Sequence, residues 1–133
     1  MVGIVVIAHG GLAEALVSAV RMIRGEISDG LIYLDVDGQD PADVIAPRIE
    51  RALRDAEASE GVLICTDMFG GTPANVALSY LEPGKVEVLT GVNLPMLLKV
   101  IEDRANLSLD ELARRAQESA RENIMMAGAL LKP

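Results

Sequence analysis

Short apolar runs alternate along the chain with stretches in which apolar residues recur at helical spacing. The runs cover residues 2–8, 31–36, 61–66 and 85–91. The first of them is continuous and rich in β-branched residues, as expected for a strand that is buried on both faces of a sheet. Between the runs, the spacing predicts helices over residues 11–24, 41–58 and 73–81, a short helix from about residue 95, and a last helix from residue 109 to about residue 123.

Local signals refine these helices. Asp40 followed by Pro41 is typical of an N-cap with a proline at the first helical position. Ser108 with Glu111 three residues later predicts a capping box for the last helix. The residues expected to face inward on the first helix are Leu12, Leu16, Ala19, Val20 and Ile23.

Alternation of strands and helices indicates an α/β protein with a parallel sheet that is covered on both faces. We expect a doubly wound, flavodoxin-like fold with four strands in the order 2-1-3-4 and one domain over residues 1–133. In such a sheet the strand order reverses between the first and third strands, and ligands bind outside the carboxyl ends of the strands at that point. The segments that follow these two strands are therefore predicted to face each other across one crevice.

Two polar residues stand at these strand ends. His9, the only histidine of the chain, closes the first apolar run, and Asp67 directly follows the third. A carboxylate that accepts a hydrogen bond from the imidazole Nδ1 leaves the lone pair of Nε2 free to act as a nucleophile. A structural interpretation stays open for each residue alone, since a histidine at a strand end can be a buried hydrogen-bonding group and Asp67 can cap a loop. Their joint placement favours a functional pair.

Glycines follow both residues and lead into helices. Gly70, Gly71 and Thr72 precede the predicted third helix, and Gly10 with Gly11 precedes the first. Backbone N–H groups at a helix start attract anions, with the helix dipole behind them. We therefore interpret Gly10, Gly70, Gly71 and Thr72 as phosphate-binding and the whole cluster as a site that carries a phosphoryl group on His9.

Composition and charge exclude several alternatives. The formal charge is −8, from 20 acidic and 12 basic residues, so nucleic acid and anionic membranes are poor partners, whereas a basic protein is a suitable one. The lone Cys65 cannot form an internal disulfide, and no cluster of Cys or His suggests a metal site. The first apolar run is too short for a signal peptide or a membrane span. We expect a protein of the cytoplasm that does not insert into the membrane.

Three segments resemble a known family in their order and spacing. They are the strand that ends in His9 and Gly10, residues 66–75 (TDMFGGTPAN) and residues 91–97 (GVNLPML). On these segments, and over essentially the whole chain, the sequence resembles the IIA domain of the mannose family of the bacterial sugar phosphotransferase system. The resemblance implies that His9 accepts a phosphoryl group from the phosphocarrier protein HPr, that Asp67 pairs with its Nδ1, and that a IIB domain is the next acceptor. No metal or other cofactor is expected, because the donor is another phosphohistidine.

Some details depart from the family pattern, and alternatives stay open. Thr72 stands where family members commonly carry serine, and Met68 and Phe69 are departures that bear on partner choice. No IIB segment follows Pro133 in this sequence, so the chain is interpreted either as a stand-alone transport subunit or as a regulatory member whose phosphorylation state is the signal. A non-catalytic binding module on the same fold and, more remotely, a tetrapyrrole metal chelatase are the other hypotheses.

The last residues form an apolar tail. Seven of the eight residues over 124–131 are apolar, and a contiguous apolar patch usually marks an interface. The resemblance implies a dimer, because family members form dimers, in some cases by exchanging a C-terminal strand that adds antiparallel to the partner's sheet. We therefore expect a homodimer with residues 124–131 at the contact, as an antiparallel edge strand or a packed helix end.

Overall fold

A computed structural model describes residues 1–27, 29–56 and 59–131 of the chain. Strands and helices alternate in it as the hydrophobic pattern predicts. The elements are β1 (Gly3–His9), α1 (Leu12–Arg24), β2 (Leu31–Val36), α2 (Ala42–Asp55), β3 (Val62–Thr66), α3 (Gly71–Leu78), β4 (Val86–Thr90), α4 (Leu94–Asp103), α5 (Leu109–Glu122) and α6 (Ala127–Leu130).

The four strands form one parallel sheet in the order β2-β1-β3-β4. This confirms the predicted doubly wound α/β fold and its strand order. In the register of the sheet, Ile7 of β1 lies beside Thr66 of β3, and His9 lies beside Val36 of β2. The end of β1 and the residue that follows β3 therefore lie at the same edge of the sheet, where the order of the strands reverses.

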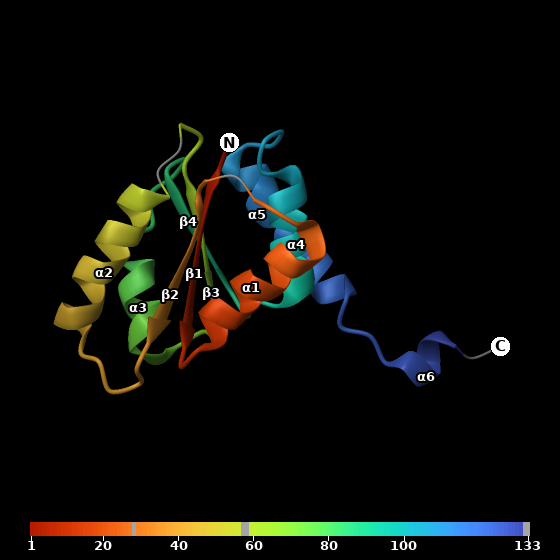
Figure 1. Ribbon diagram of the computed structural model, residues 1–133, viewed down its shortest axis with the longest axis horizontal. Helices are drawn as coiled ribbons and strands as arrows, with labels where there is room; N and C mark the ends of the chain where they lie inside the picture. Colours follow the sequence, from red (N-terminus) through yellow and green to blue (C-terminus); the bar gives the residue numbers. More distant parts are fainter. Residues whose placement is uncertain (28, 57–58, 132–133) are drawn as a thin grey trace.

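Helices cover both faces of the sheet, with α2 and α3 on one side and α1, α4 and α5 on the other (Figure 1). Side chains of β1 alternate between two buried clusters: Ile4, Val6 and Ala8 belong to the cluster that includes α1, α4 and α5 residues. Val5 and Ile7 belong to the cluster with α2 residues. Because side chains of a strand alternate between the two faces, His9 continues the second series and lies on the face of α2 and α3.

Helix α1 is rotated relative to the prediction. Its buried residues are Ala13, Val17 and Val20, whereas Leu12 and Ile23 are 44% and 56% exposed. The sequence of α1 carries two overlapping apolar stripes that are offset by one residue, and periodicity does not tell which of them meets the sheet. Of the residues predicted to face inward, Val20 is buried and Leu16 and Ala19 are partly buried. The prediction was wrong for Leu12 and Ile23.

Two helix starts also differ from the prediction. Helix α2 begins at Ala42 with Pro41 as its N-cap, and no side chain of the described residues caps it. The carboxylate of Asp40 instead accepts a hydrogen bond from the Asp37 N–H at 3.0 Å, which closes the turn after β2. Aspartate often bonds to nearby backbone in this way rather than to a helix start. The predicted end of this helix near residue 58 lies outside the described residues. Helix α3 begins at Gly71, two residues before the predicted start.

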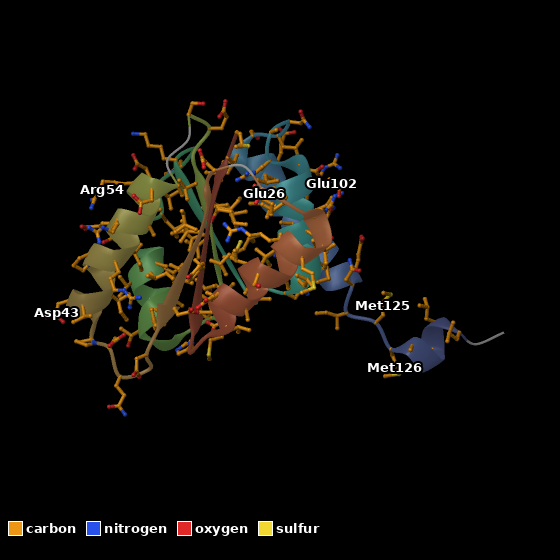
Figure 2. The ribbon with its side chains drawn as sticks, in the orientation of Figure 1. Glu26, Asp43, Arg54, Glu102, Met125 and Met126 are labelled. Carbon is orange, nitrogen blue, oxygen red and sulfur yellow. The ribbon has the colours of Figure 1, made fainter. Side chains whose placement is uncertain are left out.

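Helix α5 agrees with the prediction, but the described part of the tail does not form a strand in this chain. Ser108 and Glu111 form the predicted capping box, in which the serine Oγ accepts from the Glu111 N–H at 3.3 Å. Beyond α5, the short helix α6 and the residues around it extend away from the body of the molecule, and Met125 and Met126 lie along this extension (Figure 2). Among the described helices, none is long and apolar enough to span a membrane.

Candidate functional site

The site is centred on a hydrogen-bonded pair between β1 and the loop after β3. The Nδ1 atom of His9 lies 2.8 Å from Oδ2 of Asp67. The same carboxylate oxygen accepts a second hydrogen bond, from the backbone N–H of His9, at 2.9 Å. One oxygen thus fixes both the end of β1 and the orientation of the imidazole, so that the predicted contact between His9 and Asp67 is present.

The two partners differ in their access to solvent. The side chain of His9 is 36% exposed, and that of Asp67 is 14% exposed. Burial raises the pKa of Asp67, but the hydrogen bonds from the His9 backbone and imidazole outweigh it and hold the pKa below its ordinary value. An ionised carboxylate only accepts hydrogen bonds, so Nδ1 of His9 is the donor in this contact, and in the neutral imidazole the lone pair then lies on Nε2.

The turn after β2 lies beside the other edge of the imidazole. A Cβ added at Gly38 would be 4.0 Å from the Cδ2 atom of His9. This turn is held by the hydrogen bond from the Asp37 N–H to the Asp40 carboxylate. The imidazole ring is therefore enclosed on its Nδ1 side by Asp67 and approached on its Cδ2 side by Gly38.

The predicted phosphate-binding loop leads from Asp67 into α3. Gly70 and Gly71 have φ angles of +92° and +79°, a region that residues with a Cβ rarely adopt. No side chain among the described residues caps the start of α3, which lies on the same face of the sheet as His9. Uncapped N–H groups at a helix start are the kind of group that attracts anions. Thr72 is the second residue of the helix and adds a hydroxyl there.

The start of α1 differs in this respect, because a side chain from another element already occupies it. Oδ1 of Asp35, on β2, accepts hydrogen bonds from the N–H groups of Ala13 and Glu14 at 2.9 and 3.3 Å. The Gly10 N–H donates to the Val36 carbonyl at 3.0 Å and so extends the sheet. This revises the phosphate-binding role predicted for Gly10, whose N–H is committed to backbone.

Asp35 was not singled out from the sequence. The available signal is an acidic residue at the last but one position of an otherwise apolar strand, in LIYLDV. Such a residue faces one of the two helix layers, where it needs a hydrogen-bond donor. The sequence does not say that this donor is the start of α1.

Exposed apolar side chains stand on the loop beside the pair. Met68 and Phe69 are 52% and 74% exposed, although they directly follow the partly buried Asp67. The hydroxyl of Thr66 donates to the Met68 carbonyl at 3.4 Å, which holds this part of the loop against the end of β3. Large apolar side chains that remain in solvent next to a reactive group are typical of a protein docking surface.

Across the part of the chain that the structure describes, no group of three or more His, Cys, Asp or Glu side chains is arranged to hold a metal ion. Cys65 is fully buried in β3, and this burial raises the pKa of its thiol to about 12.

Comparison with known proteins identifies the family of this chain. The family model described as the PTS system fructose IIA component (EIIA-man) matches residues 3–117. The fructose-specific EIIA component of Bacillus subtilis is 29% identical over 133 residues, which cover 99% of this chain and 90% of that protein. The mannose-specific EIIAB component of Escherichia coli K12 is 31% identical over 125 residues, and the match spans 92% of this chain but only 38% of that protein.

A solved structure shows the same fold. The crystal structure of phosphotransferase system component EIIA from Streptococcus agalactiae superposes with a TM-score of 0.85 at 27% sequence identity. The match covers 97% of this chain and 99% of that one. The likeness thus extends over nearly the whole chain.

Proposed function

This chain belongs to the EIIA-man family of sugar phosphotransferase system components, and on that premise we propose that it accepts a phosphoryl group on Nε2 of His9 from HPr and passes it to a IIB domain or subunit. The observation that carries the proposal is the 2.8 Å contact between Nδ1 of His9 and Oδ2 of Asp67. This contact commits Nδ1 to the carboxylate and leaves Nε2 as the nucleophile.

The transfer step needs no cofactor. The Nε2 lone pair attacks the phosphorus of the donor phosphohistidine, the new N–P bond forms, and the bond to the donor imidazole breaks with its electron pair leaving on the donor nitrogen. The proton on Nδ1 stays in its hydrogen bond to Asp67, whose negative charge stabilises the cationic phosphoimidazole. In the transfer to IIB, His9 is the donor: the acceptor group of IIB attacks the phosphorus, and the bond to Nε2 of His9 breaks with its electron pair returning to Nε2.

We assign the contacts with the phosphoryl oxygens to the start of α3. Phosphoryl transfer depends mostly on positioning and on stabilising negative charge. Gly70, Gly71 and Thr72 supply N–H groups and a hydroxyl at an uncapped helix terminus. Gly10 has a different role in this proposal, because its N–H bonds to Val36 and its place is to connect β1 to α1.

We assign partner recognition to the exposed loop beside the site. Met68 and Phe69 present apolar surface next to His9, and the chain carries a net charge of −8. A partner with an apolar centre and a basic rim matches this surface, and opposite charges speed association. Because the proposed exchange is with HPr and IIB, we propose that the protein acts in the cytoplasm.

We propose a homodimer that is built through the tail. Strand β4 is an edge strand, and its five residues are only half-buried. Ile124 of the tail lines a hollow of about 280 Å³ together with Val88 and Gly91 at this edge. The tail thus leaves the body beside an edge that can pair with another chain, and its own apolar side chains are exposed (Figure 2).

The test of the proposed function is phosphorylation in a defined system. The full chain is incubated with phosphoenolpyruvate, Enzyme I and HPr, and the modification is measured by mass spectrometry and by its acid lability and base stability. We expect one phosphoryl group on the wild-type chain and none on His9→Gln, with circular dichroism showing that the variant is folded. A His9→Gln protein that still takes up phosphate would contradict the proposal.

A further inference from the structure

The two helix starts that flank His9 are not equivalent. The α3 start is uncapped by side chains in the described residues, whereas the carboxylate of Asp35 fills the α1 start through the N–H groups of Ala13 and Glu14. Helix α1 begins only three residues after His9. Without a cap, its positive end would also favour the negative charge of a phosphoryl group on His9.

The sheet fixes Asp35 in this place. It lies beside Ala8 in the register of β1 and β2, and Ala8 faces the helix layer that contains α1. The guanidinium of Arg48 holds the end of β2, but it does so through the Asp35 backbone carbonyl, at 2.7 Å. The carboxylate charge is therefore directed to α1.

We propose that Asp35 is a positioning residue that keeps the phosphoryl group on the α3 side of His9 by occupying the α1 start with a built-in anion. This inference rests on the proposed function. A carrier has to release its phosphoryl group as readily as it accepts it, and two anion-binding helix starts would over-stabilise the phosphorylated form. Asp35 lowers that stabilisation by placing negative charge on one side of the site.

The test uses charge-neutral variants and the equilibrium of exchange with HPr. Asp35→Asn keeps an oxygen acceptor for the Ala13 N–H and removes the charge. Asp37→Asn is the matched control, because Asp37 lies on the neighbouring turn and accepts from the Gln39 N–H rather than from α1. The equilibrium constant between phosphorylated HPr and this chain is measured for each variant, with the unfolding midpoint as the check on folding.

We expect Asp35→Asn to shift the equilibrium toward the phosphorylated chain by about two- to fivefold, the effect of one charge at a helix terminus. We expect a smaller shift for Asp37→Asn. Damage to the fold alone would not favour the phosphorylated state, so the direction of the change separates positioning from a structural role. An equilibrium constant that is unchanged or lowered in Asp35→Asn, or raised equally in both variants, overturns the inference.

A second measurement uses the wild-type chain. Phosphorylation should move the amide NMR signals of Gly71 and Thr72 by more than those of Ala13 and Glu14, whose N–H groups are held by Asp35. Larger shifts at Ala13 and Glu14 would place the phosphoryl group at α1 and contradict the proposal. If HPr does not phosphorylate the wild-type chain at all, the proposed function itself fails, and the two failures are thereby distinguished.

Discussion

At the scale of single residues, the site depends on one carboxylate oxygen. Oδ2 of Asp67 accepts from both the backbone N–H and the Nδ1 of His9. The backbone bond places the end of β1, and the imidazole bond selects the ring orientation. Asp67 therefore fixes both where the imidazole lies and which of its nitrogens, Nδ1, is used in the hydrogen bond.

Replacing Asp67 by asparagine should separate these two effects. Asp67→Asn keeps an oxygen acceptor, so we expect the chain to fold, but it loses the charge that orients and stabilises the imidazole. Phosphoryl exchange with HPr should slow by about 100-fold or more, by analogy with other residues that orient a catalytic histidine. Asp43→Asn, in the first turn of α2 (labelled in Figure 2), is the charge-matched control and should exchange at the wild-type rate. Equal rates for both variants would reduce Asp67 to a loop cap.

The same pair predicts a pH dependence of stability. Burial raises the pKa of Asp67, but the hydrogen bonds from His9 have the larger combined effect and hold the pKa below its ordinary value of 3.8. A carboxyl group whose pKa is lower in the folded state contributes stability that is fully present above the unfolded pKa and is lost as the pH falls through the folded one. We expect the free energy of unfolding of the wild-type chain to fall more steeply below about pH 4 than that of Asp67→Asn, as measured by denaturant titration. Parallel pH curves would rule this contribution out.

At the scale of elements, glycines of different conformation stand at the starts of the two helices: Gly71 is the first residue of α3, and Gly11 is the N-cap of α1. Gly71 at the start of α3 has a φ of +79°, whereas Gly11 at the start of α1 has a φ of −96°. The loop before α3 is therefore wound in a way that only glycine adopts without strain. Gly11 has a negative φ, which residues with a Cβ also adopt, so its position does not require glycine.

Alanine at the two positions should have unequal effects. A Cβ at Gly71 would meet only Pro73 Cδ, at 3.9 Å, and a Cβ at Gly11 would meet nothing within 4 Å, so steric clash is not the cause. The left-handed conformation makes Gly71→Ala destabilising by about 1–2 kcal/mol, whereas Gly11→Ala should change stability by no more than about 0.5 kcal/mol. Chemical denaturation of both variants measures this difference. Comparable losses would show that the start of α3 relaxes without strain.

At the scale of the whole molecule, apolar surface is concentrated away from the core on the C-terminal tail. Ile124, Met126 and Leu131 are all largely exposed, and the tail leaves the body beside the β4 edge. No residue of α6 is buried, and the dimer proposed above would cover this surface with a second chain.

Removal of the tail tests this assembly. We expect the full chain to sediment as a dimer and a chain that ends at Asn123 to sediment as a folded monomer, because the truncation removes the apolar surface that joins the two copies. Met22→Ser, which removes an exposed apolar side chain from α1, is the control and should remain a dimer. A monomeric full-length chain, or a dimer that survives the truncation, would exclude the tail as the assembly element.

By itself, the sequence determined the alternation of elements, and with a flavodoxin-like strand order it also predicted the meeting of His9 with Asp67. These features follow from local patterns, since buried parallel strands read as continuous apolar runs and polar residues that end them collect at one edge of the sheet. The capping box of α5 was predictable for the same reason, because Ser108 and Glu111 are three residues apart.

Only the tertiary structure decided which face of α1 is buried, where Asp40 bonds and what occupies each helix start. Two overlapping apolar stripes satisfy the same helical period, so contact with the sheet has to select one. Asp35 lies more than 20 residues from the N–H groups that it caps, and the Gly10 N–H bonds to Val36 through the pairing of β1 with β2. These bonds depend on strand register and on the packing of α1, which bring together residues that no local pattern connects.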